Sequence, residues 1–412
     1  MLRSLLTRLA GVRWRPWLLL AYAVSVLVVA ISKGMGPHHS ANNFYIFDWA
    51  FRNLRAGRDL YAPHPDQYLD LFKYSPAFAV LFAPLSVLPN VLALVLWDTL
   101  NTMMLALAIV RLLPDRRGDA VLALVFLETF GSMQHSQSNS LLTALLILAF
   151  LALEHERQFG AALAIAVGTA IKIFPIAGLA MALPHPRRLR FAVVFVVVIL
   201  AVLALPLLVV SPHQAKQQYV SWLTMLPRDA ASDTAAGTGM HTGGIPEQLH
   251  LWFGIQAAPW ITELAGGVVL VLPLLLRYRR WRDADFRLRF LCSLLVFLVI
   301  FNHRSESPSF VIAMVGIAIW FAISELDAVT IAVMVATFAI VSLGASSAVP
   351  SAVRVGLVMH FRLKTVPCVI AWLVMQAELW GWRHPRPSLP QVAALWTRRC
   401  GGGYDFRNRG TS

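Results

Sequence analysis

Isolated charged side chains within apolar runs are the first candidates for chemistry in this chain. Lys172 stands alone in the apolar segment 159–183, three residues before Pro175. An ammonium group at membrane depth is costly without an anionic partner, so the pattern favours a phosphate or a carboxylate beside it. Snorkelling of the long side chain towards the interface is the alternative. The nearby proline also predicts a broken helix, or two short helices, that meet near Lys172.

Asp48 is a second candidate, because it falls inside an apolar stripe. At 100° per residue, segment 43–56 predicts an amphipathic helix that lies in the membrane interface. Its stripe consists of Phe44, Phe47, Phe51 and Leu54. A carboxylate in such a stripe is costly unless it is paired or takes part in a reaction. An ion pair with Arg52, four residues later, is one interpretation and general-base chemistry is the other.

A compact polar turn between two apolar runs carries further reactive groups. His303, Arg304 and Glu306 lie within four residues of the segment NHRSESP at 302–308. Charged groups at the mouth of apolar spans are functional candidates. In the alternative interpretation, Arg304 and Glu306 pair with each other at the water interface and His303 caps a helix end.

Two amides stand in a second polar connector, SMQHSQSNS, at residues 132–140. Gln137 and Asn139 have side chains that can hydrogen-bond sugar hydroxyl groups. They can equally satisfy the free backbone groups of helix ends. Their spacing leaves both interpretations open.

Composition places these residues in a membrane protein. The chain has 412 residues, of which 58% are hydrophobic and only 14% are charged, with a mean hydropathy of +0.65. This indicates an all-α polytopic membrane protein. The net charge of +14 comes from Arg clusters between apolar runs, which indicate membrane topology and contact with anionic lipids rather than with nucleic acid. No Walker loop, GxGxxG after a strand, HExxH or CxxC motif is present, so nucleotide, dinucleotide and zinc sites are not indicated.

Hydropathy predicts a bundle of about 11 to 13 transmembrane helical segments. The distribution of Lys and Arg places the basic segment 277–289 in the cytoplasm. It places four polar segments on the opposite face, namely residues 42–76, 132–140, 211–253 and 302–308. Residues 1–381 are expected to form one membrane domain, with outer loops at 33–76 and 211–258. A cytoplasmic, basic and disordered tail is expected at 382–412.

One stretch conflicts with this topology. Residues 75–88 are apolar but short, and 91–113 form a full-length span. If both crossed the membrane, the basic turn 111–119 would return to the outside. Either 75–88 is re-entrant, or the basic turn breaks the charge rule.

Five motifs in order resemble glycosyltransferase family 87, a family of C-type membrane glycosyltransferases (GT-C). They are RAGRDLY (55–61), KYSPAFAVLFAPLSVLP (73–89), QHSQSN (134–139), GTAIKIFP (168–175) and NHRSESPSF (302–310). The resemblance implies a GT-C bundle with an amphipathic helix in the first outer loop. It also implies transfer of a hexose, with mannose as the expected sugar, from a polyprenyl-phosphate donor with inversion at the anomeric carbon.

The resemblance also implies a catalytic acid, and this chain departs from the family there. The family's aspartate lies about fourteen residues before the glycine of an xGxxLY element, which here is Gly57. Counting back reaches Asn43, whose amide cannot act as a base. We therefore expect the base to be Asp48, which shares the first-loop helix, or Glu306, which lies among more polar groups.

The remaining candidates are assigned to substrates. We expect Lys172, His303 and Arg304 at the donor phosphate, and Asn43, Gln137 and Asn139 at other substrate groups. The chemistry requires no cofactor beyond the lipid-linked sugar, and no metal ligands are evident, because Lys and Arg can balance a departing monophosphate.

The expected partners are a lipid-linked donor, a glycolipid or glycan acceptor, and membrane lipids, without nucleic acid. The expected location is the bacterial cytoplasmic membrane, with the active site on the extracytoplasmic side. Two other functions remain open. One is a secondary transporter, which would place isolated charges at membrane depth. The other is a catalytically inactive scaffold related to GT-C enzymes, which Asn43 keeps open.

Overall fold

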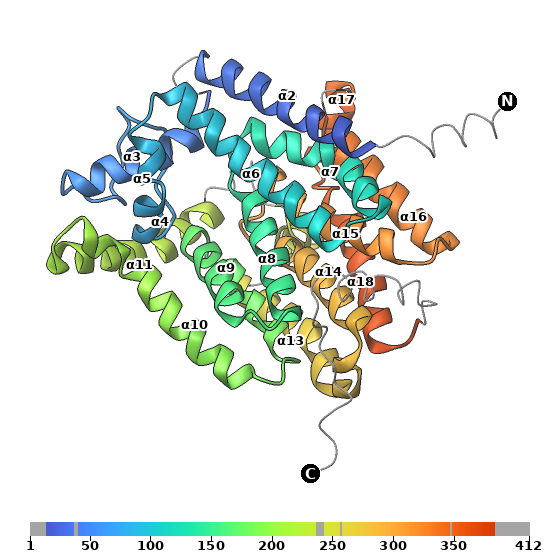
Figure 1. The fold of residues 1–412 in the computed structure, drawn as a ribbon. Helices are drawn as coiled ribbons and strands as arrows, with labels where there is room; N and C mark the ends of the chain where they lie inside the picture. Colours follow the sequence, from blue (N-terminus) through green and yellow to red (C-terminus); the bar gives the residue numbers. More distant parts are fainter. Residues whose placement is uncertain (1–13, 37–39, 236–242, 256–257, 347, 384–412) are drawn as a thin grey trace, which may run out of the picture.

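The described residues of the computed structural model, 14–36, 40–235, 243–255, 258–346 and 348–383, form helices and contain no strand. Figure 1 shows them as one bundle, in which α2 lies along one side and α10 along the other. The α-helices are α2 (Trp14–Gly34), α3 (Asn42–Arg55), α4 (Pro76–Leu81), α5 (Ala83–Ser86), α6 (Asn90–Leu112), α7 (Arg116–Gln134), α8 (Asn139–Glu154), α9 (Gln158–Ile171), α10 (Arg188–Leu203), α11 (Pro212–Ala235), α12 (Ile245–Phe253), α13 (Pro259–Leu276), α14 (Ala284–Ile300), α15 (Phe310–Ile323), α16 (Ala328–Thr337), α17 (Ser351–Val353) and α18 (Thr365–Trp380). The 3₁₀ helices are η1 (Phe174–Ala182), η2 (Leu205–Leu208), η3 (Tyr278–Arg282) and η4 (Ser307–Ser309), and the π-helices are η5 (Phe338–Leu343) and η6 (Arg354–Met359).

Apolar helices make this a multi-pass membrane protein, as the hydropathy predicts. Among the described residues, α2, α6 and α13 are long and apolar enough to cross a bilayer. Shorter apolar helices, including α8, α9 and α18, accompany them. Side chains that face away from the bundle on α10 and α13 are apolar and exposed, which is the arrangement that lipid contact favours.

The main core is densest where α14 and α15 cross. Nearly all their side chains are buried, and Gly316 of α15 lies against the backbone of α14. A Cβ atom at residue 316 would lie 2.7 Å from the carbonyl oxygen of Cys292 and 3.0 Å from the Cβ of Leu295. Because residue 316 has no side chain, α14 and α15 can approach each other closely. Small residues allow the same close approach at other helix contacts in membranes.

A buried ionic network ties three of these helices together. Arg289 of α14 is 2% exposed and contacts Asp285 at 3.0 Å and Glu378 of α18 at 2.5 Å. The indole of Trp320, from α15, donates to the same Glu378 carboxylate at 2.8 Å. Arg383 contacts the second oxygen of Glu378 at 2.8 Å. A buried carboxylate is tolerated here because both of its oxygens accept hydrogen bonds.

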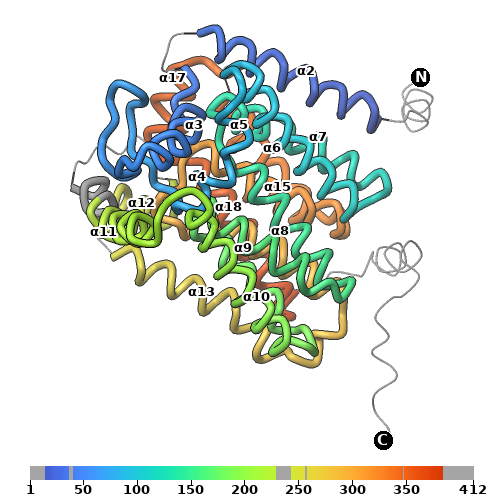
Figure 2. The backbone as a smooth tube through the Cα atoms, turned by 60° about the vertical axis from the view of Figure 1, so that its left-hand side comes forward, coloured from blue at the N-terminus to red at the C-terminus, as the bar shows by residue number. Residues whose placement is uncertain are grey.

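A second, aromatic core holds α3, and it changes the interpretation of that helix. Phe47 is fully buried, and its ring centroid lies 4.9 Å from that of Tyr74, 5.2 Å from that of Phe78 and 5.6 Å from that of Trp97. The helix predicted at 43–56 is therefore present, but its apolar side packs against protein rather than lying open to the membrane interface. Figure 2 shows α3 next to α4 and α5, both of which it contacts.

The topological conflict at 75–88 is resolved in favour of a non-crossing segment. This stretch forms two helices of six and four residues, α4 and α5, which are too short to span a membrane. At the start of α2, Arg15 pairs with Asp119 at 2.6 Å and donates to the carbonyl oxygen of Pro114 at 2.9 Å. The basic turn 111–119 therefore lies at the same end of the bundle as the start of α2.

The bundle has two chemically different ends. We call the end that contains Arg15, Glu154 and Arg287 the basic end; Arg287 pairs with Glu154 at 2.6 Å there. The opposite end, which we call the loop end, contains α3 and the turns 135–138 and 301–306. In Figure 2 its segments gather on the left, around α3, α11 and α12. The helix α14, 17 residues long, runs from the basic end, where Arg287 lies, to the loop end, where the turn 301–306 follows it.

Of two further predicted segments, one is confirmed and the other is more structured than the sequence suggested. The predicted break at Lys172 is confirmed, because α9 ends at Ile171, Lys172 is extended, and η1 follows. The predicted outer loop 211–253, by contrast, is largely helical in α11 and α12. Gln218 of α11 receives the backbone N–H of Leu60 and donates to the carbonyl of Arg58, so α11 is fixed to the first loop. Of the predicted tail, residues 384–412 lie outside the described residues.

The close approach at Gly316 makes a stability prediction. Gly316→Ala should lower the thermal unfolding temperature in detergent, because overpacking of this kind costs about 1–3 kcal/mol. Gly131→Ala on α7 is the matched control, since a Cβ there meets nothing within 4 Å and alanine favours the helix. The measurement is intrinsic fluorescence against temperature, and equal melting temperatures for Gly316→Ala and the wild type would contradict the packing argument.

Candidate active site

Lys172 lies at the loop end, where α9 stops. Lys172 is half-buried as a residue, and its ammonium group donates to Asn139 Oδ1 at 2.9 Å and to Gln137 Oε1 at 3.1 Å. Both acceptors are neutral amides, and within the described part of the chain no carboxylate forms an ion pair with Lys172. The extended backbone at residue 172 and the start of η1 turn the chain back, so this cation stays at the helix end rather than in the middle of a span.

Gln137 connects this cation to an acid. Its Oε1 accepts from Lys172, and its Nε2 donates to Glu306 Oε2 at 3.2 Å. Gln137 itself is 5% exposed, whereas Glu306 is half-buried. A cation, an amide and a carboxylate thus form one chain of contacts drawn from three separate parts of the sequence. We call Lys172, Gln137 and Glu306 the polar triad.

Local structure holds the triad in place. After α7 the backbone turns sharply, with Ser136 in the left-handed region at φ 48°, and α8 begins at Asn139. Trp97 of α6 donates to the carbonyl of Ser136 at 2.9 Å and fixes this turn. Asn139 is 1% exposed and donates to the carbonyl of Pro308 at 3.1 Å, which ties the start of α8 to the turn that carries Glu306.

His303 and Arg304 point to other partners than Glu306 does. His303 Nδ1 lies 2.7 Å from Glu263 Oε1 on α13. Arg304 contacts the carbonyl of Leu226 on α11 at 3.2 Å. Among the contacts of the described residues, the suggested pairing of Arg304 with Glu306 is not found. Among the predicted phosphate ligands, the structure therefore brings Lys172 to Glu306 and leaves His303 and Arg304 in contacts with neighbouring helices.

Asp48 has the local partner that its spacing suggested. It is 2% exposed and lies 3.1 Å from Arg52, which also donates to the carbonyl of Ser86 at 2.9 Å. Burial raises the pKa of the Asp48 carboxyl group, and Arg52 partly opposes this shift. The ion pair within α3 accounts for the position of Asp48 in the apolar stripe.

Asn43 lies beside the turn that carries Gln137. Its Nδ2 donates to the carbonyl of His135 at 2.9 Å. The position at which the resemblance implies an acid thus adjoins the site, although it carries an amide. The ring of His135 is partly withdrawn from water, which lowers its pKa, and Lys33 and Lys364 lower it further while Glu306 opposes them. His135 is a site residue that the motif analysis passed over.

A buried ion pair next to the triad was also missed. Lys364 lies 3.0 Å from Glu128 and 3.2 Å from Ser307 Oγ, and its ammonium group sits 5.0 Å from the ring centroid of Phe310. Because Ser307 follows Glu306, this pair helps to fix the turn. The available signal was Glu128 itself, a lone acid within an apolar run, which deserved the same notice as Lys172.

Asp98 was missed for the same reason. It lies in α6 next to Trp97, is 1% exposed, and its Oδ2 has no hydrogen-bond partner among the described residues. Its neighbour Asn101 accepts from the backbone N–H of Leu141 at 3.3 Å, so this stretch of α6 faces the start of α8.

The arrangement suits transfer from an anionic donor. Lys172 offers positive charge to a leaving phosphate, and Glu306 can accept a proton from a hydroxyl group. Gln137 and Asn139 orient both groups without neutralising Lys172.

Comparison with known proteins identifies the family. The sequence profile of glycosyltransferase family 87 matches residues 72–301, a segment that includes Gln137, Asn139 and Lys172 and ends before Glu306. No curated protein shows a significant sequence match. Among solved structures, the chain is similar to ArnT from Cupriavidus metallidurans bound to undecaprenyl phosphate, with 14% identity, coverage of 90% of this chain and 79% of that chain, and a TM-score of 0.41. Since the family profile covers more than half of the chain, the protein belongs to glycosyltransferase family 87.

Proposed function

We propose that this membrane glycosyltransferase moves a hexose, with mannose as the first candidate, from a polyprenyl-phosphate donor to a hydroxyl group of a glycolipid or glycan acceptor. The observation that carries the proposal is the polar triad, in which one amide touches both a cation without an ionic partner in the described chain and a carboxylate. The reaction uses no cofactor other than the lipid-linked sugar and invokes no metal ion.

Lys172 holds the donor phosphate. An ammonium group has three N–H donors, and two of them go to Asn139 and Gln137. Neutral amides position the charge without cancelling it, so an arriving phosphate gains both an ion pair and a charge-assisted hydrogen bond. The same interaction strengthens as the bond between sugar and phosphate breaks, because negative charge accumulates on the leaving group.

Glu306 acts as the base. It accepts the proton of the acceptor hydroxyl group, and the hydroxyl oxygen forms the new bond to the anomeric carbon. The bond between that carbon and the phosphate oxygen breaks, and polyprenyl phosphate leaves with its electron pair on the side of Lys172. Attack and departure on opposite faces invert the anomeric configuration. Asn43 and Gln137 supply hydrogen bonds to the substrates.

Glu306 is preferred to Asp48 as the base because of where each is held. Asp48 is 2% exposed and engaged by Arg52 within its own helix. Glu306 is half-buried, so its carboxylate remains accessible, and it shares Gln137 with the cation. His303 and Arg304 act at the edge of the site, through α13 and α11, rather than at the phosphate.

We further propose that residues 1–381 form one domain in the bacterial cytoplasmic membrane, with the basic tail in the cytoplasm. Arg clusters at the basic end favour the cytoplasm, so the loop end and the triad face outward.

Transfer of label tests the function itself. Purified protein in liposomes receives a radiolabelled polyprenyl-phosphate sugar and a lipid extract as acceptor. Labelled glycolipid indicates the proposed enzyme, whereas accumulation of intact label inside sealed vesicles without transfer indicates a transporter. If neither transfer nor uptake is observed, the protein is catalytically inactive and the proposal is refuted.

The orientation prediction uses single exposed cysteines. Cys292 and Cys368 are buried, so Cys400→Ser provides the background, to which Asp66→Cys in the first loop or Arg279→Cys in η3 is added. A membrane-impermeant maleimide should label residue 66 in intact spheroplasts and residue 279 only after permeabilisation. The reverse pattern would place the triad in the cytoplasm and contradict an extracytoplasmic reaction.

The two candidate bases predict different kinetics. Glu306→Gln should lower turnover at least about a hundredfold while donor binding persists, because a general base contributes about 10²–10⁴ in rate. Asp48→Asn should keep turnover within roughly a few-fold of the wild type, since it perturbs only the pair with Arg52. Initial rates of label transfer measure both. Loss of activity in Asp48→Asn with full activity in Glu306→Gln would reverse the assignment.

Lys172 should control donor affinity. Lys172→Met keeps a similar volume and should weaken binding of a polyprenyl phosphate at least roughly tenfold, since hydrogen bonds to charged groups contribute about 1.5–3 kcal/mol. Lys216→Met, at an exposed site on α11, removes the same charge as a control. Binding is measured by titration of the detergent-solubilised protein. Equal affinities in the two variants would mean that Lys172 does not touch the phosphate.

A further inference from the structure

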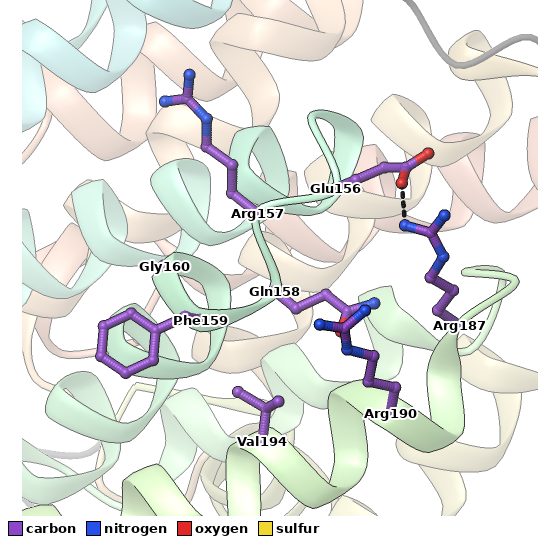
Figure 3. A pocket seen from close by; sticks show the side chains of 8 residues that line it. All are labelled: Glu156, Arg157, Gln158, Phe159, Gly160, Arg187, Arg190 and Val194. Atoms are coloured by element: carbon purple, nitrogen blue, oxygen red, sulfur yellow. Dashed lines mark hydrogen bonds and ion pairs between the residues drawn. The ribbon is translucent and has the colours of Figure 1, made fainter.

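A pocket lined by charged and apolar residues lies at the basic end, at the opposite end of α9 from the triad. It is a cavity of about 420 Å³ between the turn that joins α8 to α9 and the start of α10. Figure 3 shows the residues that line it, which are Glu156, Arg157, Gln158, Phe159, Gly160, Arg187, Arg190 and Val194. Lys172 follows the C-terminal end of α9, and this pocket lies at the N-terminal end of α9. The two sites are therefore separated by the length of that 14-residue helix.

A buried amide faces this pocket without a partner. Gln158 is 7% exposed, and neither its Nε2 nor its Oε1 has a hydrogen-bond partner among the described residues. Gln158 and Arg190 both line the pocket (Figure 3). Buried polar groups are normally hydrogen-bonded, because leaving one unpaired costs about 1–3 kcal/mol. An amide left in this way marks a place where a polar ligand can bind.

Two helices begin at the same pocket. α9 starts at Gln158 and α10 starts at Arg188, and neither N-terminus has a side-chain cap. The first turns of both helices therefore present backbone N–H groups and the positive ends of their dipoles. Such N-termini favour phosphate and other anions. Gly160, in the first turn of α9, leaves that backbone unobstructed.

The side-chain charge has the same sign. Arg157, Arg187 and Arg190 are exposed around the pocket, and the acidic residue that lines it, Glu156, is already paired with Arg187. An anion that enters meets an excess of positive charge.

The outer wall of the pocket is apolar and open to lipid. Phe159 is 63% exposed, and Val193 and Val197 on the next turns of α10 are 65% and 62% exposed. Arg190, Val193, Val194 and Val197 follow one another at helical spacing, so they form one stripe that leads from the charged mouth along α10. A ligand that suits both parts has an anionic head and a hydrocarbon tail.

We propose that this pocket binds the phosphodiester headgroup of an anionic phospholipid, with its acyl chains against α10. The phosphodiester oxygens accept hydrogen bonds from the Gln158 amide and from Arg187 and Arg190. They also accept from the uncapped backbone N–H groups at the starts of α9 and α10. This site is independent of the transfer reaction at the loop end.

Native mass spectrometry of the full chain in detergent tests the site with defined probes, namely phosphatidylglycerol, phosphatidylcholine and inorganic phosphate. Arg187→Gln/Arg190→Gln should bind phosphatidylglycerol at least about tenfold more weakly than the wild type, because each hydrogen bond lost between a guanidinium and the phosphodiester is worth roughly tenfold or more. Arg279→Gln/Arg282→Gln removes the same charge from η3 at the same end and should bind as the wild type does.

Gln158→Leu separates a built site from general charge attraction. It leaves the net charge unchanged, and removal of an unpaired buried amide should keep or raise the melting temperature without lipid. Phosphatidylglycerol should nevertheless stabilise this variant less than it stabilises the wild type. Equal loss in both double variants, full binding by Gln158→Leu, or equal binding of phosphatidylcholine would overturn the proposal. Saturation by inorganic phosphate alone, at the concentration that suffices for the lipid, would also overturn it by assigning the pocket to a free anion.

Discussion

A charge removed from water must find an opposite charge or enough hydrogen bonds, and this requirement organises the bundle. Arg289 is placed between Asp285 and Glu378, and Lys364 is placed against Glu128. Lys172 differs from these two cations, because its acceptors are the side-chain amides of Gln137 and Asn139. The fold therefore balances Arg289 and Lys364 by direct ion pairs, whereas the charge of Lys172 is held by neutral groups. Lys172 and Gln137 lie within the segment that the family profile matches, and Gln137 also contacts Glu306.

Features encoded by neighbouring residues could be predicted from the sequence. The apolar runs gave the helical class, and the pair Lys172 and Pro175 gave the break after α9, because both signals act within a turn or two of the chain. The pairing of Asp48 with Arg52 also follows from spacing on one helix. Membership of glycosyltransferase family 87 was predicted from the motif order and confirmed by the family profile. The short segment 75–88 was correctly suspected of not crossing.

Partnerships between distant segments could not be predicted. Gln137 and Glu306 are 169 positions apart and Glu128 and Lys364 are 236 apart, so no local pattern joins them. The same limit explains why α3 was expected in the membrane interface. Its stripe of Phe residues specifies a surface that must be covered, but lipid and an aromatic core both satisfy that demand. The helical character of α11 was hidden because its polar side chains serve contacts with the first loop.

The pairing of Glu128 with Lys364 has a consequence for biogenesis. Membrane helices enter the bilayer in the order of their synthesis, and α7 is therefore placed long before residue 364 leaves the ribosome. During that interval the carboxylate of Glu128 lacks the counter-ion that it has in the finished bundle. The N-terminal half therefore carries an acidic side chain without its ion-pair partner. Completion of the C-terminal helix then both neutralises α7 and fixes the turn beside Glu306. Packing of the last helix and ordering of the turn that carries Glu306 are therefore coupled through Lys364.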